Sequence, residues 1–227
     1  MGAGNKGEKI SLGMMGGLRF WAHRRLAREV FWDLGILGLQ AFDEVAWRPV
    51  CDVLLSVPQL LQLWTAKQVT GIAGTNLRLH ICSQRKPNPH CKLCPSCGVK
   101  TENCKHMLTC GESSRVDYLL RSIDRLDKWM EEQGTEPRLH LVLVRFARSR
   151  GGVTMRTTAC GLEAMFGRLA QSHDKILWRR FMEGMVSRVT VEIQQVHYNL
   201  WQVKRSTGRW AQGLVTQLTE ITHGRWM

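Results

Sequence analysis

The apolar residues of this chain recur every three or four positions over most of its length, a spacing typical of helices with one buried face. The clearest stripe is expected to begin after a cap at Ser113 or Ser114 and to end at about Gln133, where Gly134 can close a helix. Its apolar positions are Val116, Leu119, Leu120, Ile123, Leu126, Trp129 and Met130. The pattern therefore predicts an all-α fold.

A second long stripe lies in the last third of the chain. We expect Asp174 to cap a single helix that extends to about Val203. The β-branched residues of 189–191 are compatible with a short strand, but the three-four spacing continues through them, which favours a helix. The apolar positions of this stripe are Trp178, Phe181, Met182, Met185, Val189, Ile193, Val196, Leu200 and Val203.

Turn and cap residues delimit the other predicted helices. Pro58 suits the first position of a helix, and Gly71 suits the position that closes it. Further helices are predicted over about 18–34, from Thr135 and Pro137, and from Thr207 or Gly208 onward. Together these segments predict an irregular multi-helix domain.

Four regions are expected from these segments. Residues 1–17 are rich in glycine and are predicted to be a flexible leader, and residues 18–56 form an N-terminal helical segment. Residues 57–133 hold a basic helix, a cysteine-rich motif and the helix after it, whereas residues 134–227 form a helical region that packs on that motif.

The cysteine-rich motif has the spacing of a metal site. Cys94 and Cys97 form a C-x2-C pair, which Gly98 allows to turn, and His106 and Cys110 follow in an H-x3-C pair. A short helix over 101–109, capped by Thr101, would place His106 and Cys110 on one face. Three thiolates and one imidazole suit one structural zinc ion.

Alternatives to this ligand set remain open at the level of sequence. Cysteines are often small buried hydrophobic residues, so such a pattern also arises by chance. Cys91 forms another C-x2-C pair with Cys94 and competes with Cys94 or Cys97 as a ligand, and His90 lies nearby. Cys104 lies about 200° around the predicted helix from His106, so we expect it to point away from the metal.

The charge of the chain favours an anionic partner. The formal net charge is +13 and the isoelectric point is near 9.8, which is typical of proteins that bind nucleic acid, although a merely adhesive basic surface is the alternative. No acidic residue lies between Asp52 and Glu102. The basic residues of this interval are the expected nucleic-acid contacts: Lys67, Arg78, Arg85, Lys86, Lys92 and Lys100.

A second interval without acidic residues spans 137–162. Arg148 and Arg150, beside Gly151 and Gly152, are plausible phosphate contacts, because guanidinium groups match phosphate oxygens. The alternative is that such arginines only face solvent from a helix.

The cysteine-rich region resembles a known family. The segments 64–67 (WTAK), 76–78 (NLR) and 94–110 (CPSCGVKTENCKHMLTC) are similar to the zinc-binding domain that follows the polymerase in non-LTR retroelement reverse transcriptases. A looser likeness covers 34–36, 42–45, 58–64, 71–75 and 145–152. The resemblance implies a zinc-bearing accessory region without the polymerase, with ligands Cys94, Cys97, His106 and Cys110. One departure is the three-residue gap before Cys110, where many members have four.

The sequence carries no signal of catalysis, secretion or membrane insertion. It lacks a polymerase aspartate pair, a phosphate-binding GxxxxGK[ST] loop and an HExxH motif, so we do not expect an enzyme. The cysteine usage and the lack of a signal peptide or membrane span fit a reducing nuclear or cytoplasmic compartment. Two functions follow: a zinc-stapled module that binds RNA or DNA, or a helical scaffold that meets an acidic protein.

Overall fold

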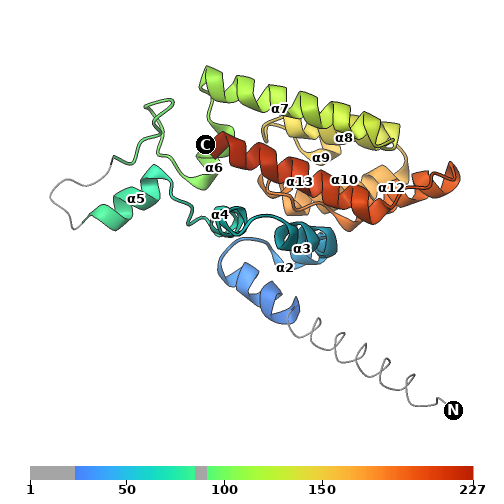
Figure 1. The fold of residues 1–227 in the computed structure, drawn as a ribbon, viewed down its shortest axis with the longest axis horizontal. Helices are drawn as coiled ribbons and strands as arrows, with labels where there is room; N and C mark the ends of the chain where they lie inside the picture. Colours follow the sequence, from blue (N-terminus) through green and yellow to red (C-terminus); the bar gives the residue numbers. More distant parts are fainter. Residues whose placement is uncertain (1–23, 85–90, 227) are drawn as a thin grey trace, which may run out of the picture. The chain divides into compact units, whose positions relative to one another are not determined.

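Helices make up nearly all of the regular structure in the computed structural model, which describes residues 24–84 and 91–226 (Figure 1). Within those residues the only β-type pairings are two isolated bridges, Val45 with Ser187 and Leu93 with Thr101, and no strand is formed. The all-α prediction is therefore confirmed. No helix in this part of the chain is both long and apolar enough to cross a membrane.

The chain divides into two units, Met1–Asp43 and Glu44–Met227. The first unit contains a helix over 24–33 and most of α2 (Leu39–Glu44). Within it, Arg24 and Arg28 both pair with Asp43, at 3.2 and 3.1 Å. The predicted leader, 1–17, lies outside the described residues, as does the first part of the helix predicted over 18–34.

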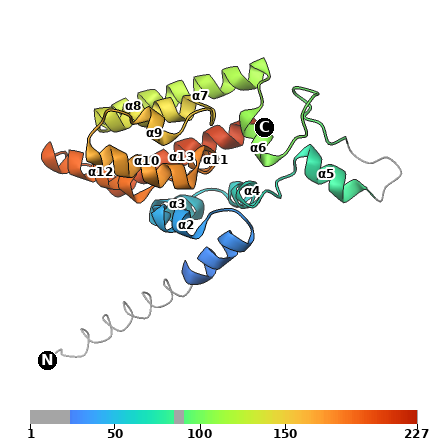
Figure 2. The same ribbon diagram turned by 180° about the vertical axis from the view of Figure 1, so that it is seen from behind.

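The second unit holds the helices that carry the predicted stripes. Their bounds are α3 (Trp47–Ser56), α4 (Gln59–Val69), α5 (Asn76–Ser83), α6 (Cys104–Thr109), α7 (Ser113–Glu132), α8 (Pro137–Arg148), α9 (Met155–Thr158), α10 (Ala164–Ile176), α11 (Trp178–Met182), α12 (Arg188–Leu200) and α13 (Thr207–Trp226). Helix α7 packs against both α8 and α13, and Figures 1 and 2 show these helices from opposite sides.

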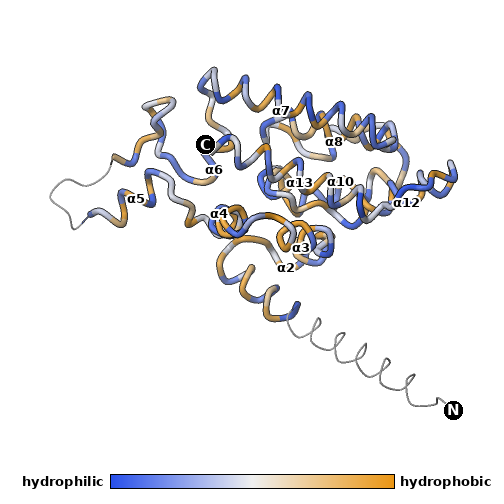
Figure 3. Tube along the Cα trace, in the orientation of Figure 1, coloured by the Kyte–Doolittle hydropathy of each residue, from blue (hydrophilic) through white to orange (hydrophobic). Residues whose placement is uncertain are grey.

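The core forms around α13, which packs against α3, α6, α7, α11 and α12. Along α7 the hydrophobic and hydrophilic positions alternate as expected for a helix with one buried face (Figure 3). Its predicted core residues Leu119, Ile123 and Leu126 are fully buried, as are Leu214 and Leu218 of α13. The stripe predicted for α7 is therefore confirmed at these positions, but Leu120, which was also predicted to lie on it, is 38% exposed.

The long helix predicted after Asp174 is wrong, because the chain turns twice within that stripe. It forms α10, α11 and α12, with breaks at Leu177 (φ 74°) and Gly184 (φ 87°). Asp174 lies inside α10, where its carboxylate accepts hydrogen bonds from the backbone N–H groups of Met155 and Arg156 at the start of α9. Residues 189–191 are helical, as predicted.

Several predicted caps are displaced by one residue. Glu112, and not Ser113 or Ser114, caps α7, and Glu136, and not Thr135, caps α8 through a 2.6 Å bond from the Leu139 N–H. Pro58 precedes the first turn of α4. The expected helix ends at Gly71 and Gly134 and the start of α13 at Thr207 are confirmed.

Candidate metal centre

The structure brings four predicted ligands together. The Sγ atoms of Cys94, Cys97 and Cys110 and a ring nitrogen of His106 all lie within 4.8 Å of one another. The Cys94 and Cys110 Sγ atoms are 3.9 Å apart, and the Cys97 Sγ atom lies 3.4 Å from His106 Nε2. Cys94, Cys110 and His106 are buried, whereas Cys97 is partly exposed. This group can hold one metal ion.

A small hairpin positions the first two ligands. The Cys94 N–H donates to the Lys100 carbonyl at 2.8 Å, and the Glu102 N–H donates to the Lys92 carbonyl at 2.9 Å. Between these arms the Gly98 N–H donates to the Cys94 carbonyl, and Gly98 has a φ of +64°, which glycine adopts without steric cost. The turn therefore brings Cys97 back towards Cys94, as the sequence predicted.

Helix α6 positions the other two ligands, and its cap differs from the prediction. Asn103 is the N-cap, and its Oδ1 accepts a 2.7 Å hydrogen bond from the His106 N–H, whereas Thr101 lies in the bridge with Leu93. Asn103 provides the side-chain acceptor for the first turn, so the helix begins at Cys104 and not directly after Thr101. Cys110 directly follows its last turn, which keeps it beside His106.

The two competing cysteines lie apart from this group. Cys91 is exposed, and its Sγ atom accepts a 3.4 Å hydrogen bond from the Leu93 N–H. Cys104 is buried elsewhere, as expected from its angle on the helix, and burial raises the pKa of its thiol. His90 lies outside the described residues.

The backbone prepares Cys97 to bind a cation. The N–H groups of Lys100 and Val99 lower the pKa of the Cys97 thiol to about 6, so that it is largely a thiolate at neutral pH. Burial raises the pKa of Cys110, so that this thiol keeps its proton until a cation replaces it. The site therefore releases protons when a metal binds.

Neighbouring segments fix the hairpin. The Asn76 N–H donates to Glu102 Oε2 at 2.9 Å, and Asn76 Nδ2 donates to the Leu93 carbonyl at 2.7 Å. Arg115 of α7 donates to Ser96 Oγ at 2.6 Å and lies 3.6 Å from Glu102. The start of α5 and the start of α7 therefore both hold the ligand-bearing loop.

Two arginines that the sequence did not assign to the site contact the end of α6. Arg225, at 4% exposure, donates to the carbonyls of Met107 and Cys110, and Arg150 donates to those of Thr109 and Cys110. Arg150 was a candidate phosphate contact, yet its guanidinium lies on this backbone. Position 225 continues the spacing of the buried stripe of α13, which is the one sequence signal for Arg225.

Four of the six predicted nucleic-acid contacts lie in described residues, and all four are exposed: Lys67, Arg78, Lys92 and Lys100. Within the described chain none of them forms an ion pair with a carboxylate. Arg85 and Lys86 lie outside it. Lys105, on α6, is also exposed and was not predicted, because it follows Glu102 and so falls beyond the interval without acidic residues.

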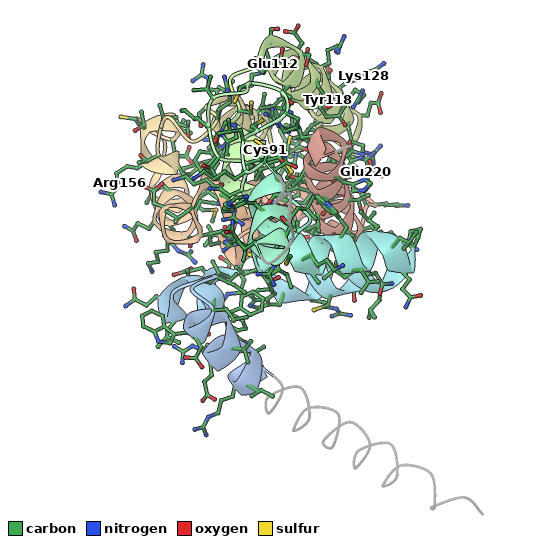
Figure 4. All side chains as sticks on the ribbon, turned by 90° about the vertical axis from the view of Figure 1, so that its left-hand side faces the viewer. Cys91, Glu112, Tyr118, Lys128, Arg156 and Glu220 are labelled. Carbon is green, nitrogen blue, oxygen red and sulfur yellow. The ribbon has the colours of Figure 1, made fainter. Side chains whose placement is uncertain are left out.

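Other cations lie farther along the second unit. Figure 4 shows Lys128 and Arg156 projecting from its outside. Arg148, the other candidate phosphate contact, pairs with Asp124 at 2.7 Å and with Asp127 at 3.4 Å. The guanidinium of Arg148 is therefore less available to a phosphate than the unpaired lysines near the metal centre.

Comparison of the chain with protein-family models, with curated proteins and with solved structures found no match in any of the three. The case for a function therefore rests on the four-residue metal group and on the charges around it.

Proposed function

We propose that this chain is a zinc-stapled, nucleic-acid-binding accessory module of a retroelement reverse-transcriptase protein, without catalysis of its own. The observation that carries the proposal is the group formed by Cys94, Cys97, His106 and Cys110, whose donor atoms lie within 4.8 Å of one another. The resemblance of the same segment to the retroelement zinc-binding domain supplies the family.

Zinc is the metal that this donor set suits best. Three thiolates and one imidazole form the tetrahedral set of structural zinc sites, and soft sulfur ligands disfavour magnesium and calcium. All four positions would be filled by protein, which leaves none for a reacting water. All eight cysteines are free thiols, which fits a reducing compartment such as the nucleus or the cytoplasm.

The lysines of the metal hairpin support a nucleic-acid partner. The hairpin pairs the backbones of Lys92 and Glu102 and those of Cys94 and Lys100, so that both exposed lysines lie on adjacent arms. The nearby carboxylate of Glu102 is buried and lies 3.6 Å from Arg115. The outer surface of the hairpin is therefore positive, and phosphate groups are its natural counter-ions.

The metal is tested by the zinc content of the purified protein. We expect about one zinc per chain, because a structural site of this class binds one ion. Changing both Cys97→Ser and His106→Ala should remove it, whereas Cys91→Ser, at an exposed thiol outside the group, should leave it bound. A folded wild-type protein without zinc would refute this half of the proposal.

Nucleic-acid binding is tested by titrating single- and double-stranded RNA and DNA at several salt concentrations. The double change Lys92→Gln and Lys100→Gln should weaken binding and reduce the slope of log affinity against log salt by about 1 for each phosphate that is no longer neutralised. Lys128→Gln with Lys204→Gln removes the same charge from exposed positions elsewhere and should change binding less. Equal effects of both pairs would exclude a site at the hairpin.

A second function, a helical scaffold for an acidic protein, is favoured by a different observation. Several large apolar side chains are exposed, among them Leu60 at 82%, Leu200 at 76% and Trp201 at 73%. Exposed apolar side chains mark a protein interface where they form a contiguous patch, and Leu200 and Trp201 are neighbours in the chain. Binding to protein alone, with little dependence on salt, would favour the scaffold over the nucleic-acid module.

A further inference from the structure

Two guanidinium groups, one from α13 and one from the turn after α8, meet carbonyls at the end of α6. Arg225 of α13 donates to the Met107 carbonyl at 3.3 Å, to the Cys110 carbonyl at 3.4 Å and to the Arg115 carbonyl at 3.0 Å. Arg150, just after α8, donates to the carbonyls of Thr109 and Cys110, both at 3.0 Å. Cys110, which is also a proposed metal ligand, is therefore held by both.

Neither arginine has an anionic partner in the described chain, although Arg225 is buried and Arg150 is half-buried. In the ranges 24–84 and 91–225 neither guanidinium lies within ion-pair distance of a carboxylate, and the neighbouring Arg115 already faces Glu102. Their hydrogen-bond acceptors are backbone carbonyls, which carry only partial charge, and the Nε of Arg150 is buried without any partner. The guanidinium of Arg115, which donates to the Arg225 carbonyl, and that of Arg150 add further positive charge beside Arg225. A buried cation without a counter-charge is costly.

The metal centre can supply this missing charge. Three thiolates carry three negative charges, and one divalent metal ion and a neutral imidazole leave about one net negative charge on the centre. That charge would be shared by three sulfur atoms, one of which belongs to Cys110, whose backbone carbonyl both guanidinium groups contact. We propose that Arg150 and Arg225 are the counter-charges of the anionic metal–thiolate centre, so that metal binding and the docking of the α13 end on α6 strengthen each other.

The backbone of Arg150 agrees with such a role. Its φ of +54° lies in the left-handed region, which a residue with a side chain rarely adopts, and glycine follows it at position 151. An unfavourable conformation persists where other contacts hold it, and here the two carbonyl bonds to α6 do so. The coupling is reciprocal, so losing the metal should loosen the end of α13.

The proposal rests on metal binding by the four-residue group, and variants of Arg225 separate the counter-charge role from zinc binding itself. Arg225→Gln keeps hydrogen-bond donors but removes the charge, whereas Arg225→Lys keeps the charge but loses the planar fork. We expect zinc affinity, measured by competition with a chelator, to fall about 10- to 100-fold in Arg225→Gln, the range typical of residues that support metal ligands. Arg225→Lys should lose less.

Arg209→Gln is the matched control, because Arg209 lies on the same helix and is exposed. It should bind zinc like the wild type. Equal zinc affinity in Arg225→Gln and the wild type would overturn the counter-charge role while leaving the zinc proposal intact, whereas a wild type that binds no zinc would refute the zinc proposal itself. Arg225→Lys losing as much affinity as Arg225→Gln would also overturn it, because the charge would then be irrelevant.

Hydrogen exchange of the wild-type protein gives a readout that needs no variant. Removing zinc with a chelator should speed exchange in α6 and in the last two turns of α13. It should leave α12 protected, because α12 packs mainly against α8, α10 and α13. Unchanged exchange at the end of α13 would contradict the coupling, even if Arg225→Gln proved too unstable to purify.

Discussion

At the residue scale, the core contains a histidine whose protonation the fold opposes. His173 of α10 is fully buried, and its ring lies 5.3 Å from that of Phe181. The Ser187 N–H donates to His173 Nε2 at 3.4 Å and Thr190 Oγ1 lies 2.9 Å from the same nitrogen, whereas the buried Nδ1 has no hydrogen-bond partner. Burial lowers the pKa of His173 to about 3.

This burial predicts a loss of stability in mild acid. The unfolded chain protonates His173 near pH 6.5 and the folded protein only near pH 3, so the stabilising difference is complete above 6.5 and is lost as pH falls towards 3. Between pH 7 and pH 5 the free energy of unfolding should fall by about 2 kcal/mol from this residue. Urea unfolding of the wild type and of His173→Asn at both pH values measures it.

The comparison of the two proteins isolates His173, because the metal ligands and the carboxylates titrate equally in both. His173→Asn should be less stable than the wild type at pH 7 and should show the smaller fall between pH 7 and pH 5. Parallel falls in both proteins would mean that His173 does not control this dependence.

Two helical glycines are predicted to respond oppositely to alanine. A Cβ atom at Gly213 of α13 would lie 2.4 Å from Trp129 Cζ2, whereas one at Gly167 of α10 would meet no atom within 4 Å. Gly213→Ala should therefore destabilise the fold by about 1–3 kcal/mol through overpacking. Gly167→Ala should stabilise it by about 0.5–1 kcal/mol, as usual for an exposed helix. Thermal unfolding of both variants checks the pair.

The metal ligands were predictable at this scale, and the arginines behind them were not. Cys94, Cys97, His106 and Cys110 have fixed spacings that local turns alone bring together. The contact of Arg225 with Cys110 joins residues that are far apart in the chain, so it depends on how α13 packs. No local pattern encodes such a contact, and only the helical spacing of position 225 indicated burial.

At the scale of elements, the stripe after Asp174 shows where periodicity misleads. Apolar residues continue at helical spacing on both sides of Leu177, so the pattern predicts no break there. The backbone of this exposed leucine has φ 74° and ψ 152°, however, and these angles end α10 and begin α11. A leucine gives no turn signal, so the break could not be predicted from residue type. The helix ends at Gly71 and Gly134 were predictable, because glycine marks them.

Leu177→Gly is therefore predicted to stabilise the protein. Glycine adopts positive φ without the clash of a Cβ atom, and the 62% exposed leucine side chain contributes little to the core. We expect a gain of about 1 kcal/mol in the free energy of unfolding. Gly184→Ala is the converse control: at φ 87°, with Thr219 Oγ1 only 3.1 Å from the added Cβ, it should destabilise. A loss of stability in Leu177→Gly would show that this backbone is unstrained.

At the scale of the whole molecule, the contacts of α3 indicate that the second unit begins before this helix. Its residues Val50 and Val53 are buried, and Asp52 accepts a 2.8 Å hydrogen bond from Gln212 of α13. Just before it, the Ala46 N–H donates to the Val186 carbonyl. A boundary near residue 57 would remove these contacts from the helix that organises the core, whereas one after Asp43 keeps them.

Two fragments distinguish these boundaries. We expect residues 44–227 to fold, to bind zinc through the same four ligands and to unfold in one cooperative transition, because the contacts of α3 with α13 remain. Residues 57–227 should expose the face of α13 that α3 covers and should be several kcal/mol less stable, since buried valines and a paired carboxylate are removed.

The zinc content of both fragments gives the decisive comparison. The metal hairpin and α6 are present in each, so zinc bound equally by both would show that the metal motif forms independently of α3. If residues 57–227 also matched the longer fragment in stability, α3 would be an appendage and the unit would begin near residue 57. Weaker zinc binding by residues 57–227 would instead show that zinc affinity depends on how α13 packs against α3. We expect this result, because Arg225 links α13 to the carbonyl of Cys110.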